Sequence, residues 1–542
     1  MIRVEFANGQ FKEFEKPVKI KKLIDKNDYN FFACKVNNKL RDFDYTITKN
    51  CKIDFVGVED SDAIKVYESS LRFILLMAAY RVNKYLSLLA SFNVSRSTIL
   101  RDKSGNEIDK VTFKKIEEEM KKIVNADYKI VRHTINREKA TKLYSELGYV
   151  DKLDLFQYRP EDEVHVYSCN GYQNYLYSYM TPSTGYLTRY KLLHHNGEIV
   201  LRYPRSELNG AIPQFVEEKT YARTLKEVRE WGKVNSSGTV QEINQHIENG
   251  GALDFVLACE NRHNIMLEEV STTIANNSKI ALIAIAGPSS SGKTTFSNRL
   301  KTKLMEKGIN PVVISMDDYY IERDPVAYKK ITDFEDINLL DIPLFNEHMR
   351  DLINGKEVEI PRFDFTTKKR VKGKKLKLDA NSPIIIEGIH ALNERMTELV
   401  PHDRKFKIYI GPQIQINLDD HNPISITHLR LIRRIVRDYQ FRNSSAENTL
   451  KMWESVRNGE FKWIYGHQEG ADFVFNSELD YEFCVTKKHI LPLLKEIKAD
   501  SQYYNLASTL KKYVKYFKDI DDDCVPRNSL LREFIGGSCF NV

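Results

Sequence analysis

The segment Gly287-Pro-Ser-Ser-Ser-Gly-Lys-Thr-Thr (287–295) constrains the fold of this 542-residue chain more than any other. It fits the pattern G-x4-G-K-[ST] and follows the apolar run IALIAIA (280–286). After it, Phe296, Leu300 and Leu304 recur at the spacing of one helix face. Backbone N–H groups of such a loop point at phosphate oxygens, and the next helix adds the positive end of its dipole. The segment therefore predicts a strand, a phosphate loop and a helix that together bind ATP or GTP.

The residues of the loop have separate roles in this interpretation. Lys293 adds a positive charge at the β- and γ-phosphates, and the hydroxyl of Thr294 is a candidate ligand for Mg²⁺. ATP is the expected co-substrate, and Mg²⁺ is the expected metal. The loop residues predicted to bind ATP are Gly287, Pro288, Ser289, Ser290, Ser291, Gly292, Lys293, Thr294 and Thr295.

Short apolar runs alternate with amphipathic stretches from residue 279 to residue 500. After the first strand, the runs PVVISMD (311–317), PIIIEGI (383–389) and FKIYIG (406–411) have the character of buried strands. Such alternation predicts an α/β fold, with a parallel sheet and helices on both of its faces.

A phosphate loop alone does not distinguish a GTPase, a motor ATPase and a small-molecule kinase. GTPases carry an NKxD string that binds guanine. The most similar string here, Asn38-Lys39-Leu40-Arg41, lacks the final Asp and lies far from the loop. The sequence therefore argues against a GTPase.

Two acidic residues end predicted strands. Asp317 ends the second strand, which we expect next to the phosphate-loop strand, so that its carboxylate faces the γ-phosphate crevice. There it can orient an acceptor hydroxyl and accept its proton; alternatively, Asp317 and Asp318 cap the next helix. Glu387 ends the third strand, where it would hold Mg²⁺ through a water molecule or position the nucleophile, unless it is a solvated acid at a strand end.

The stretch RLIRRIVRDYQFR (430–442) predicts a helix rich in arginine. Arg430, Arg434 and Arg437 share one face at spacings of four and three residues. An arginine-lined helix that closes over a transferring phosphate neutralises its charge and excludes water. The alternative is a solvated basic face.

Several motifs now follow one another in order: GPSSSGKTT, ISMDDYY, TDFEDINLLD (332–341), IPRFDFTTKKR (360–370), IIIEGIHAL and RLIRRIVRD. Residues 280–500 thereby resemble the uridine/cytidine kinase and phosphoribulokinase family. The resemblance implies that Asp317 is the catalytic base and that Glu335 is a second acidic residue near the sugar. It also implies a lid that contains Arg434, Arg437 and Arg442. Of these residues, Arg434 and Arg437 would take part in catalysis together with Lys293, and Arg442 would bind ATP.

The chain departs from the family where uridine kinases bind the pyrimidine. Phe363 and Lys368 replace a Tyr and a His, Met452 replaces a Gln, and Ser444 stands at a lid arginine position. We still expect Phe363 and Lys368 at the substrate, but with weaker discrimination between bases, because hydrogen-bonded recognition separates close analogues. Lys368, Lys369 and Arg370 could instead bind an anionic acceptor such as a sugar phosphate, or belong to a solvated hairpin.

The first half of the chain contains other domains. IRVEFANGQFKEF (2–14) predicts a hairpin with Asn8-Gly9 at its turn. Residues 1–60 resemble a TGS domain, a ubiquitin-like β-grasp module, and residues 61–210 resemble the α+β second additional domain of threonyl-tRNA synthetases. A helical connector is expected over 211–278. Residues 501–542 form a C-terminal extension, whose end LLREFIGGSCF resembles that of uridine kinase-like proteins that join these parts.

A metal or editing site in the front half is not expected. In the second additional domain of threonyl-tRNA synthetases, an HxxxH pair and a later Cys and His form the editing site. Here Ser69 and Phe73 stand at the positions of the HxxxH histidines, and only Cys169 matches the cysteine. His194 and His195 are adjacent on a predicted strand, so their side chains point to opposite faces. We interpret both histidines as structural.

Length and composition fit a folded protein of about three or four domains. The net charge of +7 is compatible with anionic substrates without requiring them. The seven cysteines form no CxxC pair, which argues against a zinc ribbon or a disulfide framework. The chain starts without a signal-peptide pattern, and its longest apolar runs (73–80 and 280–287) are shorter than the roughly 18 residues of a membrane span. We therefore expect a cytoplasmic protein without membrane contact.

Three functions remain open from the sequence. The first is a nucleoside kinase that transfers the γ-phosphate of ATP to a ribose hydroxyl. The second keeps this chemistry but uses a sugar phosphate or another alcohol as acceptor. The third is a regulatory ATPase whose TGS-like module binds structured RNA. Self-association into a homo-oligomer is compatible with all three.

Overall fold

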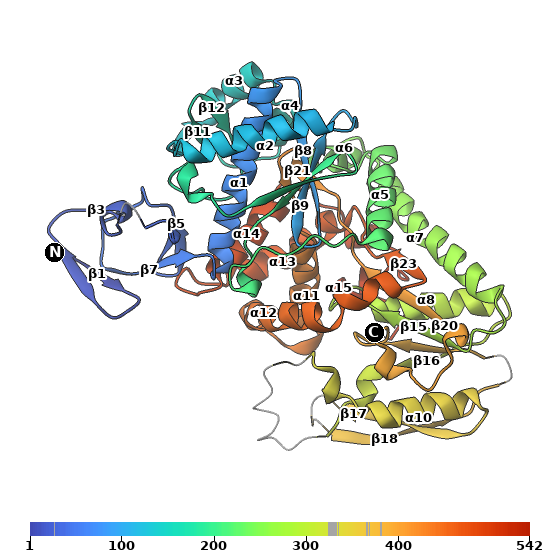
Figure 1. Cartoon of the computed structure of the whole chain (residues 1–542). Helices are drawn as coiled ribbons and strands as arrows, with labels where there is room; N and C mark the ends of the chain where they lie inside the picture. The colour runs from blue at the N-terminus through green and yellow to red at the C-terminus, as the bar shows by residue number, and fades with distance from the viewer. Residues whose placement is uncertain are drawn as a thin grey trace.

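The computed structural model describes residues 1–25, 28–322, 333, 335–364, 367, 369–379 and 382–541. Figure 1 shows a small N-terminal sheet at one side, a mixed region of helices and strands next to it, and a third region built on a parallel sheet. Within the described residues, no helix has the length and apolar character needed to cross a membrane.

The N-terminal region is a mixed sheet. Its order is β2 (Phe11–Phe14), β1 (Ile2–Phe6), β7 (Cys51–Gly57), β4 (Phe31–Val36) and β5 (Lys39–Arg41); β3 (Val18–Lys19) and β6 (Thr46–Ile47) form a separate pair. The predicted hairpin of β1 and β2 is confirmed. Its turn places Gly9 at φ +83°, in the left-handed region that favours glycine.

The second region packs helices on two antiparallel sheets. One sheet contains β13 (Lys191–His195), β14 (Glu198–Arg202), β9 (Ser97–Asp102) and β8 (Leu88–Val94), and the other contains β10 (Val131–Asn136), β11 (Glu163–Cys169) and β12 (Tyr172–Asn174). The helices are α1 (Ser61–Val82), α2 (Lys110–Asn125), α3 (Arg137–Leu147) and α4 (Val150–Phe156). Asp60 starts α1 because its side chain accepts hydrogen bonds from the N–H groups of Asp62 and Ala63, at 2.9 and 3.0 Å.

Three helices connect this region to the parallel sheet: α5 (Lys219–Val234), α6 (Val240–Glu248) and α7 (Ala252–Ala275). This agrees with the helical character predicted for 211–278. A reciprocal capping box starts α6, since the Glu242 N–H donates to the Thr239 hydroxyl and the Thr239 N–H donates to the Glu242 carboxylate.

The third region contains the predicted parallel sheet. Its order is β16 (Val312–Ser315), β19 (Ile384–Glu387), β15 (Leu282–Ala286), β20 (Lys405–Gly411) and β23 (Phe473–Asn476). The expectation that the Asp317 strand lies next to the phosphate-loop strand is wrong, because β19 lies between them. The three isoleucines of β19 are fully buried, whereas Val312 and Val313 of β16 are only half-buried, so β19 suits the inner position and β16 the edge.

Alternate residues of the sheet face two separate cores. Ile283, Ile285 and Ile408 pack with α7 and α8 (Lys293–Glu306), and with α11 (Ile426–Arg442) and α13 (Glu482–Lys495). Leu282 and Ala284 pack instead with α10 (Ile342–Ile353). Helices therefore cover both faces, as the sequence predicts.

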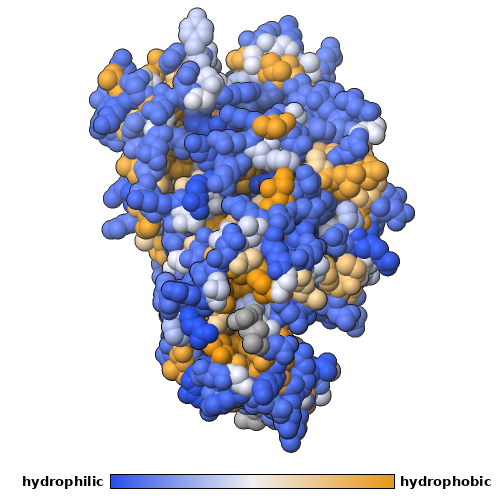
Figure 2. Space-filling model, turned by 90° about the vertical axis from the view of Figure 1, so that its right-hand side faces the viewer, coloured by the Kyte–Doolittle hydropathy of each residue, from blue (hydrophilic) through white to orange (hydrophobic). Residues whose placement is uncertain are grey.

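Beyond the sheet, a smaller lobe contains α10 and the hairpin of β17 (Val358–Asp364) and β18 (Lys369–Leu376). Figure 2 shows that the molecule narrows above this lobe and that apolar side chains gather at the narrowing. The remaining helices are α12 (Ala446–Trp463), α14 (Tyr504–Val514) and the short α15 (Arg532–Ile535), which packs against α11 (Figure 1).

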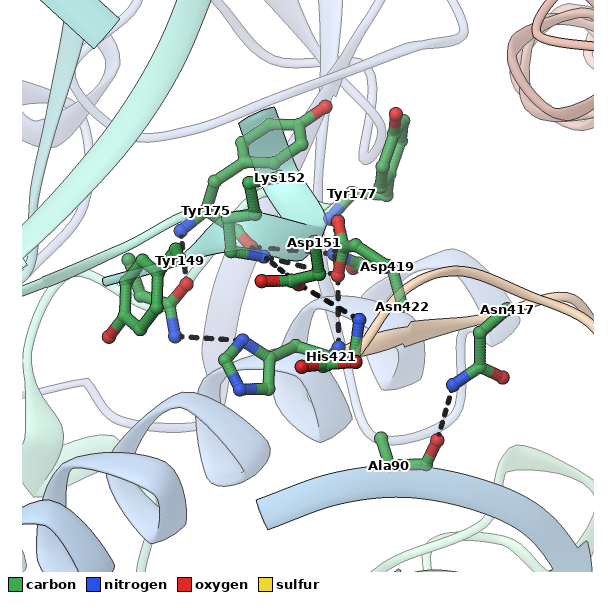
Figure 3. A network of polar contacts seen from close by, with 12 residues as sticks. Ala90, Tyr149, Asp151, Lys152, Tyr175, Tyr177, Asn417, Asp419, His421 and Asn422 are labelled. Carbon is green, nitrogen blue, oxygen red and sulfur yellow. Dashed lines mark hydrogen bonds and ion pairs between the residues drawn. The ribbon is translucent and has the colours of Figure 1, made fainter. Parts of the chain in front are cut away.

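A buried polar network joins the second region to the short hairpin of β21 (Asn417–Asp419) and β22 (Asn422–Pro423) (Figure 3). Lys152 Nζ lies 3.1 Å from Asp419 Oδ1, and both side chains are at most 1% exposed. Asn422 Nδ2 also donates to Asp419, at 2.8 Å. A buried charge is tolerated only when it is paired and hydrogen-bonded, so this network ties the two regions together.

Replacing Lys152 by Met keeps the volume of the side chain but leaves Asp419 without its cation. Because an unpaired buried charge costs about 3–5 kcal/mol, we expect K152M to lower the unfolding temperature strongly in a thermal melt followed by circular dichroism. K114M is the control, since the Lys114 side chain is 69% exposed on α2, and it is expected to change stability by less than about 1 kcal/mol. Equal melting temperatures for the two variants would contradict the importance of the pair.

Candidate active site

The phosphate loop between β15 and α8 has a backbone that only particular residues allow. A Cβ on Gly287 would lie 1.9 Å from the carbonyl oxygen of Ile410, so no side chain fits there. Gly292 has φ +90°, and Ser290 also lies in the left-handed region, at φ +60°. A serine in this region is uncommon outside functional loops. The loop thus has the tight, glycine-dependent turn that the sequence predicts.

The side chains of the loop include hydroxyls without partners. In the part of the chain that the structure describes, the buried hydroxyls of Ser290 and Ser291 make no hydrogen bond. Buried polar groups normally have partners, so unsatisfied donors in a loop of this shape fit a phosphate ligand. Lys293 folds over the loop, and its Nζ donates to the carbonyl oxygens of Gly287 and Pro288 at 3.0 and 3.3 Å.

Three predicted carboxylates gather around Lys293. Burial lowers the pKa of Lys293, while the charges of Glu387 and Asp317, and more weakly Glu335, oppose this shift. Asp317 lies on the turn of 3₁₀ helix that follows β16 (Met316–Tyr319). Its side chain is exposed, yet desolvation by the surrounding protein raises its pKa, against the charge of Lys293. The structure therefore brings these side chains together although β16 is not adjacent to β15.

Two of these carboxyl groups, those of Glu387 and Glu335, have raised pKa values. Burial, and then the charge of Asp317, raise the pKa of Glu387 to about 7, and the Ser315 hydroxyl donates to its carboxylate at 2.8 Å. Burial, and then Glu460, raise the pKa of Glu335 to about 7. Glu335 packs against Gly459 of α12, where a Cβ would lie 2.4 Å from its own Cβ. Carboxyls with raised pKa values in one crowded site are typical of functional centres.

Three arginines of helix α11 contact the phosphate loop: Arg430, Arg433 and Arg434. Arg430 Nε donates to the Ser289 carbonyl oxygen at 3.1 Å, and Arg434 Nη1 donates to the Ser289 hydroxyl at 2.8 Å. Both arginines are buried, so the alternative of a solvated basic face is wrong for them. Arg437 pairs with Asp438 at 2.9 Å, and Arg442 is 58% exposed, 3.6 Å from the same carboxylate.

Sequence reasoning gave no role to Arg433, although it lies at the centre of this contact. Its guanidinium is fully buried, binds both carboxylate oxygens of Glu482 at 2.7 and 2.8 Å, and donates to the Ser290 carbonyl oxygen at 3.4 Å. The ion pair fixes the arginine that supports the loop. No local pattern could reveal it, because Glu482 lies 49 residues away in the sequence.

Phe363, one of the residues predicted to bind the phosphoryl acceptor, is buried on β17. Its N–H donates to Asp318 Oδ1 at 3.2 Å. Asp318 therefore helps to position β17, and the residues of any following helix that it could cap (323–332) lie outside the described residues. Lys368 lies outside the described residues. Arg370 is already engaged, since it binds Asp341 at 3.0 Å and the carbonyl oxygen of Tyr320 at 3.1 Å. Met452 is 40% exposed on α12, and the Ser444 hydroxyl accepts a hydrogen bond from Asn448.

The front half shows no metal site within the described ranges, since no three His, Cys, Asp or Glu side chains are grouped to hold an ion. Ser69 and Phe73 are buried in α1, and burial raises the pKa of the Cys169 thiol to about 11. His194 Nε2 lies 2.6 Å from the Ile108 carbonyl oxygen, whereas His195 packs beside Phe215. Their different surroundings agree with the structural interpretation.

Comparison with known proteins identifies the family. The model of the "Phosphoribulokinase / Uridine kinase family" matches residues 282–481. A uridine kinase from Macrococcus caseolyticus is 30% identical over 182 residues, which are 33% of this chain and 79% of that protein. One from Mycoplasma genitalium is 31% identical over 178 residues, 32% of this chain and 74% of the other. The chain belongs to the phosphoribulokinase/uridine kinase family.

The family is one of kinases, which bind a nucleotide and transfer a phosphoryl group, so the resemblance noted for residues 280–500 is confirmed. A uridine kinase from Vibrio atlanticus matches over its full length, at 28% identity, and covers 41% of this chain. The family model lies entirely within the second half of the chain, and the TGS-like and synthetase-like assignments of the front half stay predictions.

The raised pKa of Glu335 predicts a pH effect on stability. Between pH 4.5 and about 7 the folded protein keeps a proton that the unfolded chain has lost, so the free energy of unfolding falls as pH rises through this window. Glu335→Gln removes this titration. The melting temperature of the variant relative to the natural protein is therefore expected to be higher at pH 8 than at pH 5, in buffers without divalent cations.

Glu394→Gln is the matched control. The pKa of Glu394 is lowered to about 2, and its carboxylate pairs with Lys405 and Lys407. It is charged in both states at pH 5 and pH 8, so the variant should lose the same stability at both. A Glu335→Gln effect that is also equal at the two pH values would refute the raised pKa.

Proposed function

We propose that the protein is an ATP-dependent kinase that transfers the γ-phosphoryl group to a hydroxyl of a small, nucleoside-like acceptor. The observation that carries this proposal is the convergence of Asp317, Glu335 and Glu387 on the phosphate-loop lysine Lys293. A cradle for phosphates faces a carboxylate that can receive a proton, which is the arrangement that phosphoryl transfer to an alcohol requires.

In this proposal the loop amides and Lys293 bind the phosphates, and Asp317 orients the acceptor hydroxyl and accepts its proton. Glu335 hydrogen-bonds the sugar. Arg434 and Arg437, with Arg442 at the exit of α11, neutralise the charge that develops on the transferring group. The contact of Arg434 with Ser289 supports its role, and Arg437 and Arg442 follow it on the same helix.

The residues around the loop also fit Mg²⁺. The Thr294 hydroxyl at the start of α8 is only half-buried, and Glu387 lies at the neighbouring strand end, so hard oxygen donors are available on both sides. Bound there, the ion would supply positive charge to the phosphates. Thr294 and Glu387 are the residues we propose to hold it.

A nucleoside is favoured over a sugar phosphate as acceptor. An anionic acceptor would need cations at the β17–β18 hairpin, and one of these, Arg370, is already paired with Asp341. Phe363 offers a buried ring 5.5 Å from that of Tyr320, which suits an apolar or aromatic face of the substrate.

We further propose the domain division 1–60, 61–210, 211–278, 279–500 and 501–542, with the TGS-like and synthetase-like assignments for the first two parts. A separate hydrophobic cluster supports the first of these boundaries. Val4, Ile20 and Ile53 belong to a core of the N-terminal sheet, distinct from the core around α1.

Asp317→Asn tests the proposed base. Because the amide cannot accept the proton, kcat is expected to fall by about 10²–10⁴-fold, while the Kd of Mg-ATP in calorimetry stays nearly unchanged. Asp403→Asn, the same change on an exposed turn, should keep full activity. Turnover retained in Asp317→Asn would exclude the role.

An acceptor screen tests the substrate. ADP release is measured with uridine, cytidine, purine nucleosides and pentose phosphates. We expect nucleosides to be substrates, with kcat/KM differing among bases by no more than about 200-fold, the range of an apolar pocket, since Phe363 supplies no hydrogen bond from its ring. Phe363→Tyr adds a hydroxyl and should favour pyrimidines. Activity confined to pentose phosphates would overturn the nucleoside proposal and leave the kinase chemistry standing.

A further inference from the structure

The C-terminal segment 529–535 lies against the phosphate loop, although it is outside the residues that the family model matches. Within it, Glu533 of α15 points at the start of α8. Its Oε2 accepts a hydrogen bond from the Thr295 N–H at 3.1 Å and another from the Thr295 hydroxyl at 2.9 Å. The side chain is almost completely buried there.

The Glu533 carboxylate occupies hydrogen-bond donors that bind phosphate in phosphate loops of this type. The first N–H groups of a helix have no partner within the helix, and in a phosphate loop they bind the phosphates of the nucleotide. The Thr295 N–H is one of these groups, the last in the loop. The charge of Glu533 also acts on the rest of the site, since it opposes the lowering of the Lys293 pKa and helps to raise that of Glu387.

The segment that carries Glu533 is anchored in the core. Leu530, Leu531 and Phe534 are at most 1% exposed. Leu530 covers Gly292, where a Cβ would lie 2.4 Å from the leucine side chain, and the Arg433 guanidinium lies 5.2 Å from the centre of the Phe534 ring. Because these contacts fix the backbone of α15, nucleotide can displace the Glu533 side chain without detaching the segment.

We propose that Glu533 is a residue of the nucleotide site that competes with the α-phosphate for Thr295. This inference rests on the proposed function, in which the loop binds ATP. Without nucleotide, the carboxylate satisfies the Thr295 donors; when nucleotide binds, the carboxylate leaves them and the α-phosphate takes its place. The C-terminal segment thereby weakens nucleotide binding, and it does so from outside the domain shared with the relatives.

Glu533→Gln tests the competition, because the amide keeps the shape of the side chain and removes its charge. A hydrogen bond to a charged group is stronger than one to a neutral group, so the neutral side chain is easier to displace. We expect the Kd of Mg-ADP in calorimetry to fall about tenfold, while the melting temperature without nucleotide falls slightly. Asp523→Asn is the control: it makes the same change of charge at an exposed residue whose N–H donates to Asp521 within its own turn. Its Kd should equal that of the natural protein.

The alternative is that Glu533 is a permanent cap of α8. In that case Glu533→Gln lowers the melting temperature and leaves the Kd unchanged or weakens binding, and the proposal is overturned. Should the glutamine variant unfold at the assay temperature, Glu533→Asp takes its place, since the shorter side chain keeps the charge but reaches Thr295 less well; it too is expected to bind Mg-ADP more tightly.

The experiment separates this inference from the proposed function. If the natural protein binds Mg-ADP and Glu533→Gln binds it no better, only the competition is refuted. If neither protein binds Mg-ADP at millimolar concentration, the nucleotide site itself is refuted, and the inference with it. A crystal structure of the ADP complex is the direct check: the competition requires the Glu533 carboxylate to lie beyond hydrogen-bond distance of Thr295.

Discussion

The site depends on one half-buried cation. Lys293 is held by the glycine-rich turn between β15 and α8, where desolvation lowers the pKa of its ammonium group. Such a charge is stable only if anions surround it. Four separate elements supply them: the 3₁₀ turn after β16 (Asp317), the end of β19 (Glu387), the segment before α10 (Glu335) and the C-terminal α15 (Glu533). Carboxylates from four separate parts of the fold therefore act on a single lysine.

Much of this arrangement can be predicted from the sequence because it is local. The strand, loop and helix around 287–295 follow from one motif, and Asp317 and Glu387 follow from their place at the ends of apolar runs. The order of the strands cannot be predicted in this way, since it depends on which run is apolar enough for the inner position. The three buried isoleucines of β19 decide it.

Contacts between distant segments were not predictable either. The pairs Arg433–Glu482 and Glu533–Thr295 join residues 49 and 238 positions apart. Taken alone, Arg433, Glu482 and Glu533 are ordinary charged residues, and Thr295 is one residue of the phosphate loop. Their roles appear only when folding brings both partners out of water, where an unpaired charge is costly and a paired one is specific.

The front half is coupled to the site through the hairpin of β21 and β22. Lys152 pairs with Asp419 on this hairpin (Figure 3). The Asn174 side chain lies 3.2 Å from His421 Nδ1. Burial lowers the pKa of His421 to about 3, so the imidazole is neutral and adds no further charge to the network. Only two residues separate β22 from α11, the helix of the arginines. The second region therefore helps to fix where that helix begins.

Along α11 the arginines fall into two groups according to their carboxylate partners. Arg430 and Arg433 each have a buried carboxylate, Glu460 and Glu482, and they support the backbone of the phosphate loop. Further along the helix, three arginines share a single acid. Arg434, Arg437 and Arg442 all pair with Asp438, at 3.3, 2.9 and 3.6 Å.

One carboxylate cannot neutralise three guanidinium groups, so this end of α11 keeps a net positive charge beside the loop. Neighbouring arginines lower the pKa values of Arg434 and Arg442 further, after desolvation. An anion that binds between these arginines and Lys293 would relieve their mutual repulsion and replace the water that they lose on burial. In the proposed function, a transferring phosphoryl group would supply the negative charge that this end of the helix lacks. Arg430 and Arg433, by contrast, already have buried carboxylate partners.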